Sequence, residues 1–264
     1  MMAKTVVITG STRGIGYGLA DSFLALGCSV VVSGRTAQKV NETIQKLSAK
    51  YDAERIFGHP CDVAVYEQVQ SLWDASREHF GRVDIWINNA GITNRQAKFW
   101  ELGQDEFKAV IDTNIVGTMN GVKVVLQGML EQGHGGIYNM FGLGSRGHRQ
   151  AGLAAYGTSK AAVRYLHDSL VSEVKGTPVL VASISPGMVL TDFITEARER
   201  NPEDWEQVRR IMNIIGDRVE IVTPWIAGKI LENKKNGTQI NWSTGLKIFF
   251  RFLSAPISKR NIVD

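Results

Sequence analysis

Six short runs of mainly apolar residues recur along the first part of the chain, and they constrain the fold more than any other feature. They are TVVIT (5–9), SVVVS (29–33), RIFGH (55–59), VDIWIN (83–88), GIYN (136–139) and VLVASI (179–184). The apolar residues are continuous rather than alternating, as in parallel strands covered on both faces, and helix-length segments separate the runs. We therefore predict a single-domain α/β fold, a Rossmann-like doubly wound parallel sheet with helices on both faces. TQINW (238–242) is predicted to add a seventh strand.

Length and composition agree with one soluble α/β domain. The 264 residues suffice for a full core. The sequence contains no apolar run near the ~20 residues that a membrane span needs, and its first ten residues lack the features of a signal peptide. Two cysteines, Cys28 and Cys61, are too few for a disulfide framework and favour a reducing compartment. We expect a cytoplasmic protein.

The charged residues narrow the choice of partners. The formal net charge is +4, and the positive residues are scattered, so nucleic acid is not expected, whereas an anionic small molecule is compatible. The five histidines show no pairing with cysteines or carboxylates at metal-ligand spacing, so no metal is expected.

A glycine-rich turn, TGSTRGIG (9–16), follows the first strand and precedes a helix. Its three glycines allow the backbone to turn tightly and approach a pyrophosphate at the helix N-terminus, where free N–H groups attract anions. A simple tight turn is the alternative, but the strand–turn–helix context favours a dinucleotide site.

The end of the second strand indicates which dinucleotide binds. SGRT (33–36) has Gly34 and Arg35 where an NAD-binding unit usually carries an acidic residue. Arg13, in the glycine turn, is a second cation that could meet a 2′-phosphate. The alternative is that both arginines are merely solvated. The missing acid and the two cations together favour NADP(H).

Six motifs, in their order and spacing, resemble the short-chain dehydrogenase/reductase (SDR) family. They are TGSTRGIG (9–16), CDV (61–63), NNAG (88–91), DTNIVG (112–117), YGTSK (156–160) and SPGMVLTDF (185–193). The resemblance covers roughly residues 4–193 and implies an NADP-dependent oxidoreductase. Residues 1–264 would form one SDR domain, with the substrate lid, last strand and C-terminal amphipathic helix in 194–264. A homodimer or homotetramer is expected.

The resemblance also implies cofactor-binding positions. These are Gly10, Ser11, Arg13, Gly14, Ile15, Gly16, Arg35, Asp62, Val63, Asn89, Ala90, Gly91, Tyr156, Lys160, Pro186, Gly187, Val189 and Thr191. Two alternatives stay open: Asp62 could be only the N-cap of the following helix, and Pro-Gly at 186–187 could be only a turn.

Tyr156 and Lys160 are four residues apart, which places them on one face of a helix. An ammonium near the phenol favours the phenolate, so we expect the tyrosine pKa to fall from ~10 toward neutrality. By the resemblance, Tyr156 gives a proton to a carbonyl oxygen as hydride arrives and takes one in the reverse direction. Asn114 would position a water that links Lys160 to solvent. As an isolated pair, Tyr156 and Lys160 would be only a surface contact.

The sequence departs from the family at its catalytic serine. The serine usually stands a few residues after the asparagine of the fifth strand, where this chain has Phe141, Gly142 and Leu143; the nearest serine is Ser145. A glycine-rich loop could bring Ser145 to the substrate oxygen, which makes Ser145 a candidate catalytic residue. The alternatives are that Ser145 is only a turn residue, and that backbone N–H groups of 142–144 hold the oxygen.

NMFGLGS (139–145), SPGMVLTD (185–192) and the tail TGLKIFFRFLSAPISKRN (244–261) resemble the chlorophyll(ide) b reductase branch of the family. That branch reduces a formyl group on a chlorin ring with NADPH. The broader expectation is a reductase of a bulky apolar aldehyde or ketone. A non-catalytic NADP(H)-binding sensor or scaffold of the same fold is the alternative, although Asn114, Tyr156 and Lys160 argue against it.

The segment 246–253 is predicted to form an amphipathic helix. One face carries Leu246, Phe249, Phe250 and Leu253, and another carries Lys247 and Arg251. The apolar face could pack on a partner subunit, form the floor of the substrate pocket or make a weak contact with a membrane surface. Burial in an oligomer is the commonest outcome for such a face.

Overall fold

The computed structural model describes residues 3–191, 205–255 and 260–263. Its central sheet has seven strands in the order β3-β2-β1-β4-β5-β6-β9, all paired in parallel. They are β1 (Thr5–Ile8), β2 (Ser29–Gly34), β3 (Ile56–Pro60), β4 (Ile85–Asn88), β5 (Gly135–Met140), β6 (Val179–Ser185) and β9 (Gln239–Asn241). The doubly wound parallel sheet is confirmed. The strand order reverses between β1 and β4, and in such sheets ligands bind at the carboxyl ends of the strands beside this reversal.

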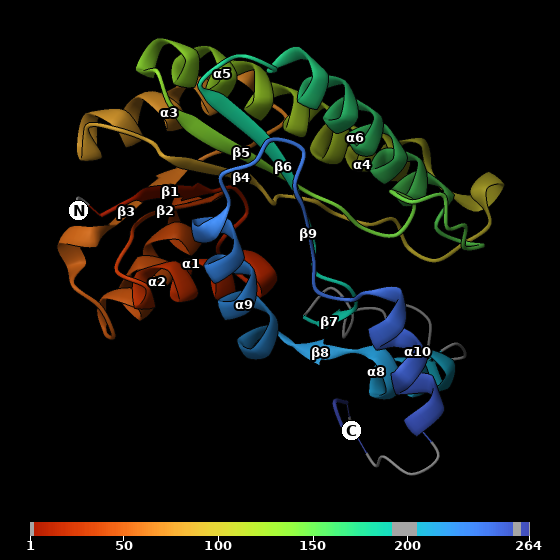
Figure 1. The fold of residues 1–264 in the computed structure, drawn as a ribbon. Helices are drawn as coiled ribbons and strands as arrows, with labels where there is room; N and C mark the ends of the chain where they lie inside the picture. Colours follow the sequence, from red (N-terminus) through yellow and green to blue (C-terminus); the bar gives the residue numbers. More distant parts are fainter. Residues whose placement is uncertain (1–2, 192–204, 256–259, 264) are drawn as a thin grey trace.

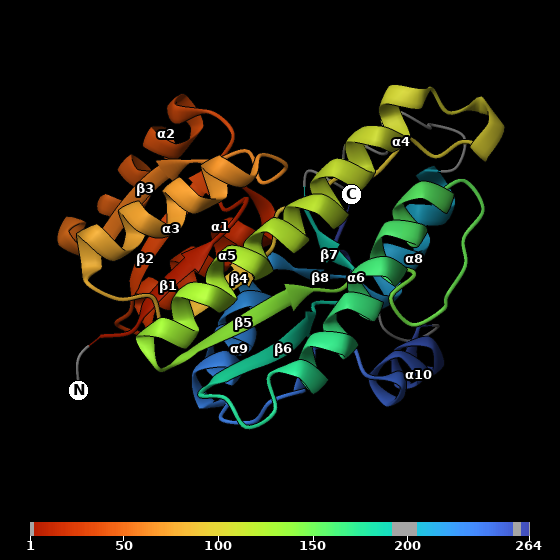
Figure 2. The same cartoon turned by 90° about the horizontal axis from the view of Figure 1, so that it is seen from above.

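Helices cover both faces of the sheet, as Figures 1 and 2 show. One face carries α1 (Gly14–Ala25), α2 (Ala37–Ser48) and α9 (Val219–Glu232). The other carries α3 (Tyr66–Phe80), α5 (Gly117–Gln132) and α6 (Ala154–Glu173), with α4 (Gln104–Ile111) packed against α6. Short helical turns are η1 (Ala53–Arg55), η2 (Phe99–Glu101) and the π-helical η3 (Asp112–Val116).

The apolar core forms two layers because successive strand residues point to opposite faces. In β1, Val6 and Ile8 join the layer that includes Phe23 of α1. Val7, between them, joins the layer under α3 and α5 that includes Trp73. Inner strands such as β1 and β4 are therefore buried on both sides, which explains why their apolar residues are continuous in the sequence.

A small unit lies beyond the central sheet, and its pair of strands was not predicted. Strand β7 (Val189–Leu190) pairs in parallel with β8 (Asp217–Arg218), next to α8 (Trp205–Ile215) and α10 (Gly245–Ser254), at the lower right of Figure 1. Residues 192–204, with which the predicted lid begins, lie outside the described residues.

A buried carboxylate fastens α10 to this unit. Asp217 is 2% exposed and accepts hydrogen bonds from Arg251 (2.8 and 2.9 Å), Arg260 (2.9 Å) and Trp242 Nε1 (2.6 Å). The basic face of α10 is therefore turned inward, and its apolar face stays exposed, with Leu246 at 72% and Phe249 at 61%. The predicted amphipathic helix is confirmed, and its apolar face is uncovered in the single chain.

The alternative role of Asp62 as an N-cap is corrected by the structure. Helix α3 begins only at Tyr66, after Val65 as N-cap residue. Asp62 instead stabilises the turn before the helix, where its Oδ1 accepts the Ala64 N–H at 3.0 Å. In the part of the chain that the structure describes, no helix is long and apolar enough to cross a membrane.

Candidate active site

The glycine turn forms a closely packed cradle where β1 meets α1. Gly10 and Gly14 have φ of +63° and +56°, in the left-handed region that favours glycine. A Cβ atom on Gly10 would lie 2.9 Å from Ala90 Cα, and one on Gly16 would lie 2.6 Å from Asn89 Nδ2. The first turn of α1 carries no acidic residue. This cradle fits a bound phosphate, because backbone N–H groups at a helix N-terminus attract anions.

Hydrogen bonds join the glycine turn to the NNAG segment after β4. Asn89 Nδ2 donates to the carbonyls of Thr9 (2.9 Å) and Gly10 (3.0 Å). Thr9 Oγ1 accepts the N–H groups of Asn89 and Ala90, each at 3.1 Å. These bonds hold the two segments together across the point where the strand order reverses. Thr9 was not predicted as a site residue, although its place in TGSTRGIG was an available signal.

The two candidate arginines lie on neighbouring segments. The Ser11 N–H donates to Ser33 O at 2.8 Å, and Ser11 Oγ accepts the Ser33 N–H at 2.9 Å. These bonds tie the glycine turn to the end of β2, and Arg13 and Arg35 each stand two residues after one of the joined serines. Both side chains are exposed. Ile15 is half-buried in the first turn of α1.

The CDV segment (61–63) is the next one along the carboxyl edge of the sheet. The Cys61 N–H donates to Gly34 O at 2.9 Å, which places Asp62 and Val63 beside the end of β2. Val63 is buried, and its carbonyl accepts Asn120 Nδ2 at 2.9 Å. Asp62 and Val63 therefore lie at the same carboxyl edge as the arginines.

Lys160 lies beside Tyr156 and, with Asn114, close to Gly91. Lys160 Nζ lies 5.8 Å from the centroid of the Tyr156 ring and donates to Met140 O at 3.2 Å. A Cβ atom on Gly91 would lie 3.2 Å from Asn114 Oδ1 and 3.6 Å from Lys160 Nζ. The structure thus brings together the tyrosine, lysine and asparagine, with only glycine between the amide and the ammonium.

Asn114 is held in the π-helical turn η3 between α4 and α5. Its Oδ1 accepts the Ile92 N–H at 2.8 Å, and its Nδ2 donates to Ile92 O and to Ser159 Oγ, each at 2.9 Å. Single π-helical turns occur frequently at functional sites. This one lets the Asn114 side chain reach the NNAG segment and helix α6 together.

Two residues that support Tyr156 were missed by the sequence analysis. Asn94 is buried; its Oδ1 accepts the Tyr156 N–H at 3.1 Å, and its Nδ2 donates to Gly152 O at 2.9 Å. Ser159 Oγ donates to Tyr156 O at 2.7 Å. Nothing in the sequence pattern links Asn94 to a helix that begins sixty residues later, so only the fold reveals this contact.

Burial sets the pKa values of the pair. It raises the pKa of Tyr156 to about 12 and lowers the pKa of Lys160 to about 8, because a buried site disfavours the charged form of each group. The expected fall of the tyrosine pKa toward neutrality is not seen in the protein alone. Tyr156 is held as a protonated phenol, the form that donates a proton.

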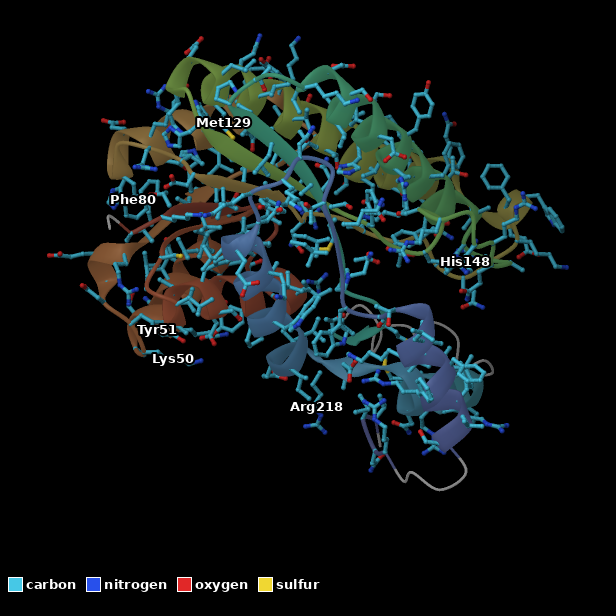
Figure 3. All side chains as sticks on the ribbon, in the orientation of Figure 1. Lys50, Tyr51, Phe80, Met129, His148 and Arg218 are labelled. Atoms are coloured by element: carbon cyan, nitrogen blue, oxygen red, sulfur yellow. The ribbon has the colours of Figure 1, made fainter. Side chains whose placement is uncertain are left out.

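The Ser145 hydroxyl is used within the chain. Its Oγ accepts the Gly142 N–H at 3.1 Å and donates to Lys160 O at 3.2 Å, and Ser145 is 6% exposed. This geometry supports the alternative in which Ser145 shapes the turn. The rest of the loop leads to the surface, where Figure 3 shows His148 at the opposite end of the molecule from Phe80.

The last predicted segment at the carboxyl edge of the sheet is Pro186–Thr191. Pro186 is buried, and Gly187 has a φ of +77° and packs against Ser243. Val189 is buried in β7. A Cβ atom on Gly14 would lie 3.4 Å from Thr191 Cγ2, so Thr191 lies beside the glycine turn. The Pro-Gly turn thus directs the chain back to the phosphate cradle.

Metal sites in proteins use groups of His, Cys, Asp or Glu side chains as ligands. Within residues 3–191, 205–255 and 260–263, no three His, Cys, Asp or Glu side chains are grouped to hold an ion. Cys28 and Cys61 are both buried free thiols.

Comparison with known proteins agrees with this geometry. The sequence model described as short chain dehydrogenase matches residues 4–202. The chain is 34% identical to chlorophyll(ide) b reductase NOL, chloroplastic, of Oryza sativa subsp. japonica, over 94% of this chain and 74% of the relative. It is 33% identical to the Arabidopsis thaliana protein of the same name, over 94% and 72% of the two chains. Among solved structures, an actinorhodin polyketide ketoreductase variant with NADPH is similar, with a TM-score of 0.81 and 27% identity, over 93% of this chain and 97% of the other.

The burial of Lys160 predicts a stability that depends on pH. Because its pKa falls from 10.5 to about 8 on folding, the unfolded chain binds more protons between these values, and stability should rise across this range. Lys160→Met removes the charge and should raise the unfolding free energy near pH 7 by at most about 3 kcal/mol. This gain should vanish above about pH 10.5.

Thermal unfolding of the cofactor-free protein at a series of pH values measures the effect. Lys229→Met, at an exposed lysine of α9, is the control and should show no such trend. A Lys160→Met protein that differs from the wild type by the same amount at every pH would contradict the role of burial.

Proposed function

Since this chain belongs to the short-chain dehydrogenase family, we propose that it reduces an aldehyde or ketone of a bulky apolar substrate, with NADP(H) as cofactor. The observation that carries the proposal is that Lys160 lies beside the Tyr156 ring and, with Asn114, close to Gly91. This group lies at the same sheet edge as the phosphate cradle, so a hydride donor and a proton donor can reach one carbonyl.

The residues of the site fit a dinucleotide with a 2′-phosphate. The turn of Gly10, Gly14 and Gly16, whose backbone packs closely on Ala90, Thr191 and Asn89, would hold the pyrophosphate at the N-terminus of α1. Arg13 and Arg35 supply exposed cations on segments that hydrogen bonds join. The adenine would be contacted by Asp62 and Val63. The floor of the cofactor site would be formed by Asn89, Ala90 and Gly91, and the nicotinamide end would be held by Pro186–Thr191. The NADPH in the ketoreductase structure supports the cofactor by analogy.

The chain's own residues supply the proton chemistry. When bound, NADPH supplies hydride to the carbonyl carbon. Tyr156 donates its hydroxyl proton to the carbonyl oxygen, and the nearby Lys160 ammonium stabilises the phenolate that remains. With a pKa of about 8, Lys160 can also pass a proton on near neutral pH. In the reverse direction Tyr156 accepts the proton from the alcohol.

For the substrate, we propose a formyl group on a large ring, as in chlorophyll(ide) b reduction. The two plant relatives carry that activity in their names. Apolar side chains are exposed on η2, with Trp100 at 79%, and on α10, and both elements lie toward the right of Figure 1. Exposed apolar surface of this kind is typical of sites that bind apolar ligands or partners.

The remaining proposals concern assembly and location. We propose a homodimer or homotetramer, for which the uncovered apolar face of α10 is a candidate interface; a weak membrane-surface contact is the alternative. We propose a cytoplasmic location on the two free thiols, whereas the plant relatives are named as chloroplastic.

The cofactor assignment predicts that NADPH binds more tightly than NADH. Charge-assisted hydrogen bonds from Arg35 and Arg13 to the 2′-phosphate would contribute roughly 1.5–3 kcal/mol each. Arg35→Asp should erase or reverse the preference in fluorescence titrations without unfolding the protein. Lys175→Asp, the same charge change at an exposed residue after α6, should leave it intact. Equal binding of the two cofactors by the wild type would refute this role of the arginines.

The proton-donor assignment predicts that Tyr156→Phe keeps cofactor binding while reduction nearly stops. Loss of a positioned acid costs about 10²–10⁴-fold in rate. The measurement is NADPH oxidation with aromatic and chlorin aldehydes, alongside NADPH titration of both proteins. A Phe variant with substantial activity would require another donor, and His148 would be the first candidate. NADPH binding without turnover by the wild type would favour the sensor or scaffold.

A further inference from the structure

The loop between β5 and α6 is fastened to α6 by one hydroxyl. Ser145 Oγ accepts the Gly142 N–H and donates to Lys160 O, while the Ser145 N–H donates to Gly142 O at 3.1 Å. These three bonds close a tight turn over residues 142–145 and attach it to the helix that carries Tyr156 and Lys160.

The number of protons on this hydroxyl limits what it can do. A serine hydroxyl has a single hydrogen to donate, and in this turn Lys160 O receives it. Donation to a substrate oxygen would break that bond and leave a buried carbonyl with one partner fewer. The geometry therefore assigns Ser145 to holding the loop in place.

The residue that faces the tyrosine hydroxyl is Gly142. A Cβ atom on Gly142 would overlap the Tyr156 hydroxyl oxygen and lie 3.3 Å from Cζ and 3.4 Å from Lys160 Cε. Any side chain at this position, serine included, would displace the hydroxyl. The phenol lies where it does because residue 142 has no side chain.

A second glycine fixes how closely the loop approaches the helix. Gly144 has a φ of +100°, and a Cβ atom there would lie 2.5 Å from Gly157 O and 2.7 Å from Gly157 Cα. The loop backbone thus rests directly on α6 one residue after Tyr156. Contact on both sides of the turn leaves little freedom in the position of Gly142.

We propose that Gly142 is a positioning residue for Tyr156, and that Ser145 holds the β5–α6 loop on the helix without touching substrate. Reduction by this chain then proceeds without a serine hydroxyl from this loop at the carbonyl oxygen. This inference rests on the proposed reductase function. It also implies that a serine placed at 142, where the resemblance leads one to expect it, harms the site instead of completing it.

The test uses the full-length protein and three site variants. Gly142→Ala adds only a methyl group, Gly142→Ser adds the missing hydroxyl, and Ser145→Ala removes the fastening. Gly228→Ala is the matched control, because it is a glycine in α9 whose added methyl would meet nothing within 4 Å. For each protein the measurements are kcat and KM for an aromatic aldehyde, the pH profile of kcat, NADPH affinity and the melting temperature.

Both Gly142 variants should lose at least about tenfold in kcat, with a shifted pH profile and nearly unchanged NADPH affinity, because loss of a well-placed general acid costs up to 10²–10⁴-fold. Ser145→Ala should melt several degrees lower and lose less than about tenfold in kcat, since the removal of an oxyanion donor would cost about 10²–10³-fold. Gly228→Ala should match the wild type in rate.

The proposal is overturned if Gly142→Ser is as active as the wild type or more so. It is also overturned if Ser145→Ala loses 100-fold or more in kcat at an unchanged melting temperature, since that is the cost of a lost transition-state contact. If the Gly142 variants do not fold, the result for Ser145→Ala alone decides whether the proposal stands.

If the wild type binds NADPH and reduces no carbonyl, the proposed function fails, and a titration still tests the positioning. Tyrosinate absorbance, measured as the difference between each protein and its Tyr156→Phe counterpart, reports the pKa of this phenol. The pKa of Tyr156 should be lower in the Gly142→Ala protein than in the wild type, because the displaced hydroxyl is less buried. An unchanged pKa would overturn the positioning role.

Discussion

The first turns of helix α6 are held by hydrogen bonds from four separate segments, and the geometry of the whole site depends on them. Asn94, after β4, holds the Tyr156 N–H, and the end of β5 receives the Lys160 ammonium through Met140 O. Ser145 holds the Lys160 carbonyl, and Asn114 holds Ser159. Each bond comes from the carboxyl edge of the parallel sheet or from the π-helical turn η3. The sheet therefore fixes the tyrosine and lysine relative to the glycine turn that would bind the phosphates.

This mode of attachment also explains the ionisation of the pair. Contact of the first turns of α6 with Asn94, after β4, and with Met140, at the end of β5, accompanies the burial of both side chains, so the phenol keeps its proton and the ammonium releases its proton more readily. The Lys160 ammonium is held by the carbonyl of Met140. Its pKa is easily changed by an anion or a dipole that binds nearby. The pKa values of Tyr156 and Lys160 therefore depend on what binds beside Gly91.

Local patterns predicted the strands, the glycine turn and the one-face placement of Tyr156 and Lys160, because each depends on neighbouring residues. Contacts between distant segments were not predictable: the β7–β8 pair, Asn94 beneath Tyr156 and the carboxylate of Asp217 all arise only when the chain is folded. The expected tyrosine pKa had the wrong direction because spacing reveals the ammonium and not the burial. The Ser145 hydroxyl was open to several roles in the sequence, since a glycine-rich loop permits many conformations, and its two hydrogen bonds are visible only in the structure.

The central claim, that this site passes hydride and proton to one carbonyl, is tested most directly by isotope transfer. The wild-type protein would be incubated with NADPH that carries deuterium in place of both hydrogens at the nicotinamide C4 and with an aromatic or chlorin aldehyde, and the alcohol would be analysed by mass spectrometry and NMR. The account predicts one deuterium, bound to the former carbonyl carbon and on a single face. Bound NADPH with no alcohol formed, or an alcohol whose carbon carries no label, would contradict it.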